Sequence, residues 1–376
     1  PCCQGVIALT DDESVNVKVA ITSKLLRPQV PVICRAESQS TVANLASFDT
    51  DHIINPYRVF ADHLAMALRT PSVHLLYKWL ISIPGLPLPE PIRPPRGTWI
   101  VCGFGRFGRA VNRYLQFEGV PTVIIEPDPA QAPKGAIVGR GTEAVTLREA
   151  GVEKAIGIVA GADSDINNLS IIMTAKALNP ELYVVARQNR RSNDPVFATA
   201  PIDLVMQASR IIVWRVLPLL TSPLLGDFLR HARHHNEQWA QELIDRLRGI
   251  CGGRTPLIWP VMLDSEEAPA VQLLLQEGAC VTLDRLLREP RGREEKLNCL
   301  TLMLWREGKE ELLPSEDLSL RAGDRLLLCG RPEMREQLEW ALYNRNVLEY
   351  LLTGEEYPDG YIWRWLAHRH QQRAAR

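Results

Sequence analysis

The sequence predicts an α/β protein with Rossmann-like parallel sheets, one present as a half-unit and one complete, followed by a small C-terminal α+β domain. Three observations predict this class: an internal repeat, a glycine loop between a strand and a helix, and a change of pattern after residue 255. Apolar runs alternate with helix-period segments up to residue 205, which favours a parallel sheet covered on both faces.

The repeat superposes residues 5–71 on residues 157–223 at a constant shift of 152 positions, without a gap. In each copy an apolar run leads into a polar turn, a helix-period segment, a proline and a β-branched run, which is the pattern of a βαβ unit. The identical pairs include Gly5 and Gly157, Ala8 and Ala160, Asp11 and Asp163, Asn16 and Asn168, Thr22 and Thr174, Lys24 and Lys176, Pro28 and Pro180, Arg35 and Arg187, Asp51 and Asp203, and Arg58 and Arg210.

Only the second copy is preceded by the other half of a Rossmann unit. That half is predicted as strand 99–102, a glycine loop, helix 110–117, strand 122–125 and strand 136–138. The first copy therefore predicts the second half of another unit, whose first half we expect upstream of Pro1.

Composition shifts predict the domain boundaries. Six prolines between residues 84 and 95 indicate a stiff linker, because proline fixes its own φ and extends the preceding residue. Residues 211–220 and 229–247 have helical periodicity. We expect a half Rossmann unit at 1–75, a linker at 76–96, a complete unit at 97–225, a connecting helix at 226–255, an α+β domain at 256–340 and a tail at 341–376.

Charge and cysteine usage exclude several functions. With 43 basic and 44 acidic residues, the chain has no field that would gather nucleic acid, so no nucleic-acid partner is expected. The eight cysteines form no C-x-x-C pair, and the histidines at 231, 234 and 235 have no nearby ligand cysteines and no H-E-x-x-H pattern, so no metal site is predicted. The longest apolar stretch is interrupted by Arg210 and Arg215, which argues against a membrane span.

The residues Gly103, Phe104, Gly105, Arg106, Phe107 and Gly108 form a G-x-G-x-x-G loop after a predicted strand and before a predicted helix. The first glycine allows a tight turn, the second lets a phosphate approach the backbone, and the third lets helix and strand pack closely. Glu126 ends the next strand, where a carboxylate accepts ribose hydroxyls and disfavours a 2′-phosphate. The pattern predicts NAD(H) or an adenine nucleotide (ATP, ADP or AMP); inherited structure around an empty crevice is the alternative.

Four further charged residues are candidates for this site, each with a structural alternative. Arg106 is a candidate phosphate ligand or a surface arginine, and Arg140 reaches a phosphate or faces solvent. Asp163 lies where ligands of open α/β sheets bind, or serves in helix capping. Arg187 is an anion ligand or a partner in an ion pair. No catalytic set accompanies these residues, so we expect no enzyme.

Four segments resemble the regulator of potassium conductance (RCK) domains, also called TrkA-N and TrkA-C domains. Residues 100–108 are similar to that family's G-x-G-R-x-G loop, with Glu126 at its ribose acid. Residues 8–16 and 160–168 resemble its turn after the fourth strand, and residues 318–330 its TrkA-C closing signature. Arg140 stands where the family usually has an acidic residue. No TrkA-C-like module separates the two copies, and this arrangement is closer to that of a channel with tandem gating domains.

The resemblance implies a function in potassium transport. It implies a ligand-sensing region at the cytoplasmic face of the cell membrane, assembled as a dimer-based gating ring. Its partner would be a transmembrane pore, either upstream in the same polypeptide or in a separate subunit. An NAD-dependent oxidoreductase and a nucleotide-binding scaffold without ion transport remain as alternatives.

Overall fold

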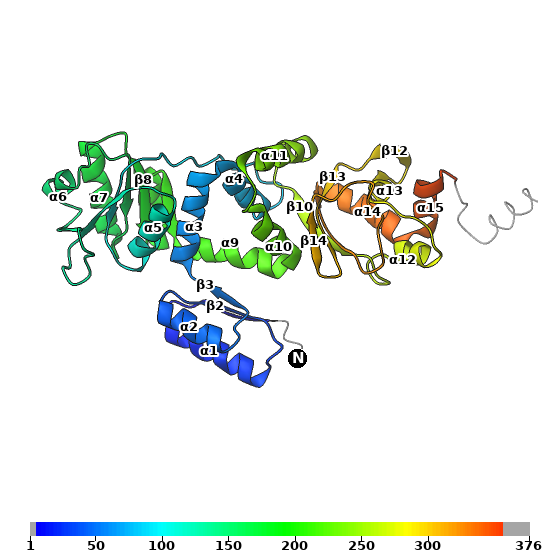
Figure 1. Ribbon diagram of the computed structural model, residues 1–376, viewed down its shortest axis with the longest axis horizontal. Coiled ribbons are helices and arrows are strands. Elements are labelled where there is room, and N and C mark those ends of the chain that lie inside the picture. The colour runs from blue at the N-terminus through cyan, green and yellow to red at the C-terminus, as the bar shows by residue number, and fades with distance from the viewer. Residues whose placement is uncertain (1–4, 356–376) are drawn as a thin grey trace, which may run out of the picture. The chain divides into compact units, whose positions relative to one another are not determined.

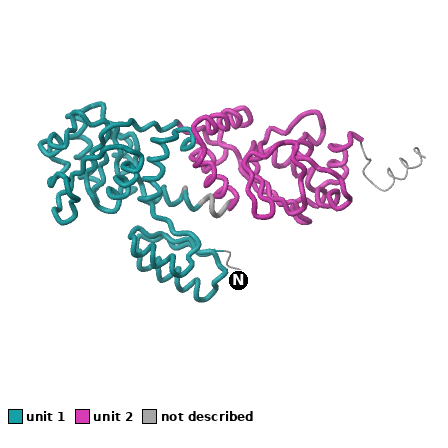
Figure 2. The backbone as a smooth tube through the Cα atoms, viewed as in Figure 1, with its two compact units in different colours: residues 1–75, 91–217 teal, residues 76–90, 218–376 magenta. Residues whose placement is uncertain are grey.

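The computed structural model describes residues 5–355 and divides into two compact units, which Figure 2 shows in different colours. Unit 1 comprises Pro1–Leu75 and Pro91–Leu217, and unit 2 comprises Leu76–Glu90 and Pro218–Arg376. The sheets of unit 1 are parallel, whereas those of unit 2 are antiparallel. This confirms the predicted fold class.

Unit 1 begins with a three-stranded sheet in the order β1-β2-β3, which is the predicted half-unit (Figure 1). Asp12 and Ser38 start its two helices by accepting backbone N–H bonds with their side chains. Ala20 and Leu45, one from each helix, are fully buried in a single core with the strands, so both helices cover one face. The elements are β1 (Val6–Ala8), α1 (Glu13–Leu26), β2 (Val32–Arg35), α2 (Gln39–Ser47) and β3 (His52–Ile54).

The second sheet of unit 1 has six parallel strands in the order β6-β5-β4-β7-β8-β9, the doubly wound Rossmann order. Its strand order reverses between β4 and β7, and ligands of such sheets bind at that point. The strands are β4 (Trp99–Cys102), β5 (Thr122–Glu126), β6 (Ile137–Val138), β7 (Gly157–Ala160), β8 (Tyr183–Gln188) and β9 (Leu204–Gln207). The helices are α5 (Arg106–Phe117), α6 (Ala144–Glu149), α7 (Asp165–Leu178), α8 (Asp194–Thr199) and α9 (Ala208–Thr221).

Side chains alternate between the two faces of this sheet. Ile100 and Cys102 belong to a core with α6 and α7, whereas Trp99 and Val101 belong to a core with α5. The second core also contains five side chains of α3 (Pro56–Arg69), a helix that follows the first sheet. A helix of the first repeat thus covers the sheet of the second.

The repeat appears in the structure as matching elements and matching hydrogen bonds. Helices α1, α3 and α4 (Pro71–Leu80) correspond residue for residue to α7, α9 and α10 (Pro223–Ala232) at the shift of 152. Asn16 and Asn168 each hold the turn before their helix and accept a backbone N–H there, at 2.9 Å and 2.8 Å. The paired asparagines therefore explain part of the sequence identity between the copies.

Unit 2 is built around a four-stranded antiparallel sheet in the order β10-β15-β13-β14. Its main core joins Leu326 and Leu328 of this sheet to α12, α14 and α15. At the turn before β15, the carboxylate of Asp324, which is 1% exposed, accepts two bonds from Arg306. The elements are α11 (Glu237–Cys251), β10 (Leu257–Met262), α12 (Pro269–Gln276), α13 (Leu283–Leu286), β11 (Arg288–Glu289), β12 (Gly292–Lys296), β13 (Cys299–Arg306), β14 (Lys309–Leu312), β15 (Arg325–Gly330), α14 (Pro332–Tyr343) and α15 (Arg345–Thr353).

Three expected elements differ from the structure. The helix predicted at 229–247 is two helices, α10 and α11, because Asn236 caps a new helix by accepting the N–H of Trp239. The predicted linker at 76–96 begins with the last turns of α4, where Trp79 is fully buried. The predicted tail at 341–376 includes α15, whose Leu348 and Leu351 are buried, and residues 356–376 lie outside the described part of the chain.

Within residues 5–355, no helix is both long enough and apolar enough to cross a membrane.

Candidate nucleotide-binding site

The candidate site lies at the carboxyl edge of the six-stranded sheet in unit 1. The glycine loop follows β4, Glu126 ends β5, Arg140 follows β6, Asp163 follows β7 and Arg187 lies near the end of β8. Because all these strands are parallel, their carboxyl ends share one edge of the sheet. The structure therefore brings every predicted site residue to the same edge.

The three glycines of the loop have different surroundings. Gly103 has a φ of +91°, and a Cβ there would lie 3.1 Å from the carbonyl oxygen of Gly161. A Cβ on Gly108 would lie 1.9 Å from the carbonyl oxygen of Gly103, so only glycine lets α5 start this close to β4. A Cβ on Gly105 would meet nothing within 4 Å, so the space that a phosphate would need is open there.

Helix α5 begins at this open position without a side-chain cap. Its N-cap residue is Gly105, and its first turn contains no acidic residue. The first N–H groups of a helix lack partners within the helix and carry partial positive charge. The start of α5 can therefore hold an anion.

Glu126 is buried, with 6% of its surface exposed, and faces the glycine loop. One carboxylate oxygen accepts the backbone N–H of Phe104 at 2.5 Å, and the other accepts that of Asp128 at 3.1 Å. These two bonds fix the carboxylate beside the loop, where ribose hydroxyls of a bound nucleotide could donate to it.

The two aromatic rings of the glycine loop, those of Phe104 and Phe107, are held by contacts with neighbouring side chains. Phe107 is fully buried, and its ring packs against those of Tyr57 and Phe60. The guanidinium of Arg109 lies 5.6 Å from the centroid of the Phe104 ring and donates to the Phe104 carbonyl at 2.8 Å. Phe104 is thus held at the loop by a neighbouring cation.

Arg140, Asp163 and Arg187 differ in their environments. Arg140 is exposed directly after β6. Arg187 is largely buried and pairs with Asp163 at 2.5 Å, while the carboxylate of Asp163 stays 90% exposed. The same guanidinium donates to the hydroxyl of Tyr57 at 3.1 Å. Arg187 therefore makes the ion pair foreseen as its structural alternative.

Asp165 fixes the loop after β8. It accepts the backbone N–H groups of Asn189 and Arg190, at 2.6 Å and 3.1 Å, and the side-chain amide of Asn193 at 2.6 Å. Burial opposes ionisation of this carboxyl group, but these donors outweigh it and lower the pKa of Asp165. The N-cap of helix α7 is Ser164, whose side chain accepts the backbone N–H of Asn167, so Asp163 does not have the capping role given as its structural alternative.

Two residues of the first repeat reach this site, and sequence reasoning missed them. Glu37 pairs with Arg106 at 3.0 Å, and Tyr57 contacts Arg187. The second repeat has Asn189 and Ser209 at the corresponding positions. Because most positions differ between the two copies of the repeat, these two differences gave no signal of their own in the sequence.

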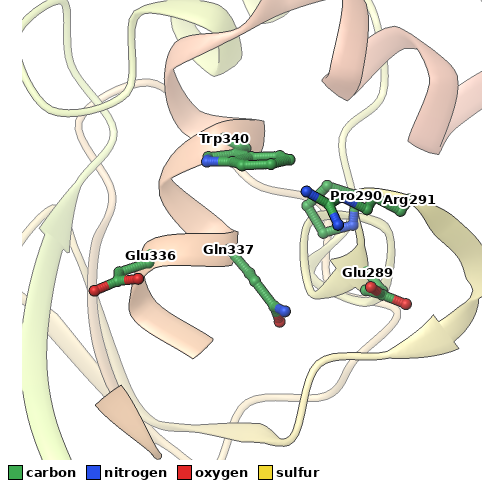
Figure 3. A pocket seen from close by; sticks show the side chains of 6 residues that line it. All are labelled: Glu289, Pro290, Arg291, Glu336, Gln337 and Trp340. Carbon is green, nitrogen blue, oxygen red and sulfur yellow. The ribbon is translucent and has the colours of Figure 1, made fainter. Parts of the chain in front are cut away.

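A pocket in unit 2 has a different character (Figure 3). Trp340, Gln337 and Glu336 line it from α14, opposite the turn between β11 and β12. Its arginine, Arg291, already lies 5.0 Å from the centroid of the Trp340 ring, and two carboxylates line the same space. This pocket is therefore poorly suited to a phosphate, and the carboxyl edge of the six-stranded sheet in unit 1 remains the candidate nucleotide site. The lining residues are Glu289, Pro290, Arg291, Glu336, Gln337 and Trp340.

Comparison with known proteins identifies the family of the chain. The TrkA-N domain family matches residues 1–56 and 99–208, which contain both parallel sheets. Potassium channel protein 1 of Methanocaldococcus jannaschii is 33% identical over 256 residues, which cover 66% of this chain and 67% of that protein. This chain belongs to the RCK family.

Other RCK-related proteins match different shares of the chain. The Trk system potassium uptake protein TrkA of Streptomyces coelicolor is 26% identical over 48% of this chain and 87% of its own length. The solved GsuK channel bound to NAD has a TM-score of 0.45 at 16% identity, covering 90% of this chain and 67% of that one. This RCK chain spans 43% of probable potassium channel protein 2 of Methanocaldococcus jannaschii and 37% of a putative K(+) efflux antiporter KefB of Alkalimonas amylolytica.

Proposed function

We propose that this chain is a nucleotide-sensing regulatory region of a potassium channel or transporter, and that it acts without catalysing a reaction. The ligand is NAD(H) or an adenine nucleotide, held at the carboxyl edge of the six-stranded sheet. The regulated partner is a transmembrane pore, and the chain works as a dimer-based assembly at the cytoplasmic face of the membrane.

The observation that carries the nucleotide proposal is the glycine loop. Open space at Gly105 lies at the start of α5, which has no side-chain cap, and Gly108 lets that helix begin against β4. A phosphate at Gly105 would accept N–H groups of the first turn and gain from the helix dipole.

The position of Glu126 selects among nucleotides. Its carboxylate is fixed beside the loop by two backbone N–H groups, so a ribose with free 2′ and 3′ hydroxyls can donate to it. A 2′-phosphate would place negative charge against this buried carboxylate. The site therefore favours NAD(H) or ATP, ADP and AMP over NADP.

The proposal for potassium transport is supported by the relatives of the chain. Its RCK-family relatives are named as potassium channel, uptake and efflux proteins. A regulatory domain of this kind acts through a difference in ligand affinity between two states, because only that difference can shift an equilibrium. Nucleotide bound at the glycine loop would supply the difference.

Calorimetric titration of the chain with NAD⁺, NADH, ATP, ADP and AMP tests the site. Gly105→Asp should abolish binding while the fold persists, because the added carboxylate would lie in the open space where the phosphate belongs. Gly105→Ala is the matched control, since it adds a methyl group without charge and should retain most of the affinity. Binding unchanged by Gly105→Asp would refute the site, and turnover of a substrate with bound NAD(H) would favour an oxidoreductase.

A further inference from the structure

An acidic side chain of the first repeat contacts the glycine loop of the second. The Oε2 atom of Glu37 lies 3.0 Å from Nη1 of Arg106, the first residue of α5. Glu37 follows β2, and 8% of its side chain is exposed, whereas 56% of the Arg106 side chain is exposed. The arginine nearest the open position at Gly105 is therefore already paired with a carboxylate.

Glu37 is held in place independently of Arg106. Its other carboxylate oxygen accepts Nη2 of Arg35 at 2.5 Å and Nε at 3.2 Å. Arg35 in turn pairs with Asp11 at 2.5 Å. Glu37 would thus keep a charged partner if Arg106 moved away, so breaking the contact with Arg106 does not leave an unpaired buried carboxylate.

The contact is not a simple by-product of the repeat. Arg35, Asp11 and their counterparts Arg187 and Asp163 form the same ion pair in both copies. Glu37 has Asn189 as its counterpart, which carries no charge. The first repeat therefore has an anion at this place that the second lacks.

A phosphate at the glycine loop would meet this arrangement directly. It would compete with Glu37 for the guanidinium of Arg106, and a second negative charge close to the carboxylate is unfavourable. Tyr57 of the same repeat lies nearby; burial raises the pKa of its phenol, the charge of Arg187 opposes this and that of Glu37 adds to it. Tyr57 is thus a neutral neighbour. Of the carboxylates of the first repeat near the loop, Glu37 makes the ion pair with Arg106, and Glu13 also feels the charge of that arginine.

We propose that Glu37 is a specificity-determining residue. It competes with bound phosphate for Arg106 and thereby lowers the affinity of the glycine loop for nucleotides with more than one phosphate. The inference rests on the proposed nucleotide site and specifies how the first repeat acts on it. The more negative charge a ligand places at the loop, the greater the effect of Glu37.

Calorimetric titration of AMP and ADP into the natural chain and into Glu37→Gln tests the inference. We expect Glu37→Gln to bind ADP about two- to fivefold more tightly, the size typical of a partly exposed charge pair, and to change AMP binding less. In an Arg106→Gln background the same substitution should have little effect, because the competition is gone. Raising the ionic strength should shrink the difference.

Asp11→Asn is the matched control, because Asp11 also pairs with Arg35 but its side chain is 96% exposed and, among the described residues, forms no ion pair with Arg106. It should leave both affinities unchanged. Thermal unfolding of each variant verifies that the fold persists, and Glu37→Ala serves if Glu37→Gln does not fold.

The outcomes separate this inference from the nucleotide site itself. If the natural chain binds ADP and Glu37→Gln binds it equally or more weakly, Glu37 is a structural ion-pair partner only and the inference is wrong. If Glu37→Gln binds ADP while the natural chain does not, the competition is supported in its strongest form. If neither chain nor variant binds either nucleotide, the proposed site and the inference both fall.

Discussion

At the residue scale, the site depends on carboxylates that organise backbone N–H groups rather than on groups that face solvent. Glu126 fixes the glycine loop and Asp165 fixes the loop after β8, each through two backbone donors. In the first repeat Glu13, the counterpart of Asp165, accepts the N–H groups of Glu37 and Ser38 in the same way. These contacts position the loops that follow the strands, and therefore the carboxyl edge of the sheet where the candidate site lies.

The lowered pKa of Asp165 predicts how stability depends on pH. Because its pKa is lower in the folded chain, the ionised carboxylate stabilises the fold above the unfolded pKa, near 4, and this contribution is lost as the pH falls through the folded value. We expect Asp165→Asn to cost about 1–3 kcal/mol at pH 7 and to reduce the loss of stability in acid. Urea unfolding at several pH values measures both.

A suitable comparison is Asp128→Asn, since Asp128 is an exposed carboxylate with only local donors. Its effect at pH 7 should be smaller than that of Asp165→Asn. Equal losses for the two variants at every pH would show that Asp165 has no special role.

Sequence reasoning located the loop residues because each follows a strand in a recognised order, and parallel strands bring their ends together. It did not find Glu37 or Tyr57. Both contacts depend on how the first repeat packs against α5, and no local pattern encodes packing between segments about 70 residues and 130 residues apart. For Arg106 the sequence offered a phosphate ligand or a surface arginine, and its ion pair with Glu37 was not predicted.

At the element scale, α3 is the main link between the two repeats. Its apolar face lies in one core with Trp99, Val101 and Phe107, although the chain of α3 belongs to the first repeat. Helical periodicity in the sequence indicates that such a helix has an apolar face, but not which sheet it covers. The break between α10 and α11 was likewise missed, although residues 233–238 contain no apolar residue and Asn236 is a residue type that caps helices.

Removing one side chain of α3 should destabilise the sheet of the second repeat. Leu64 is 2% exposed in that core, so Leu64→Ala should lower the free energy of unfolding of unit 1 by about 2–5 kcal/mol. Leu26→Ala, at a position 77% exposed at the end of α1, should change it by less than about 0.5 kcal/mol. Chemical denaturation followed by tryptophan fluorescence compares the two, and similar values would contradict the assigned packing.

At the scale of the whole molecule, each unit has at least one hydrophobic core of its own. The largest core of unit 2 includes Leu328 and the residues of α14 and α15, whereas the cores of unit 1 surround the two parallel sheets. The sequence predicted a division into a Rossmann-like part and an α+β part, because the glycine loop is typical of the first and the signature at residues 318–330 resembles that of a TrkA-C domain. It did not predict that residues 76–90 join unit 2.

Separate cores predict separate responses to ligand and to mutation. Differential scanning calorimetry should show ADP raising the transition of unit 1, since a ligand that binds only the folded state stabilises it by mass action. Leu328→Ala should lower the transition of unit 2 by removing a fully buried side chain, and should leave ADP affinity within about twofold. A single transition that shifts with both changes would contradict this division.

The position of α3 also bears on how such a chain can change during evolution. Duplicated segments usually drift apart freely, and one copy can be lost once the other suffices. Here, residues 56–69 complete the interior of a domain that begins only after residue 90. Deletion of the first copy would remove part of the core that packs against the second copy's sheet, so we expect the two copies to be retained together.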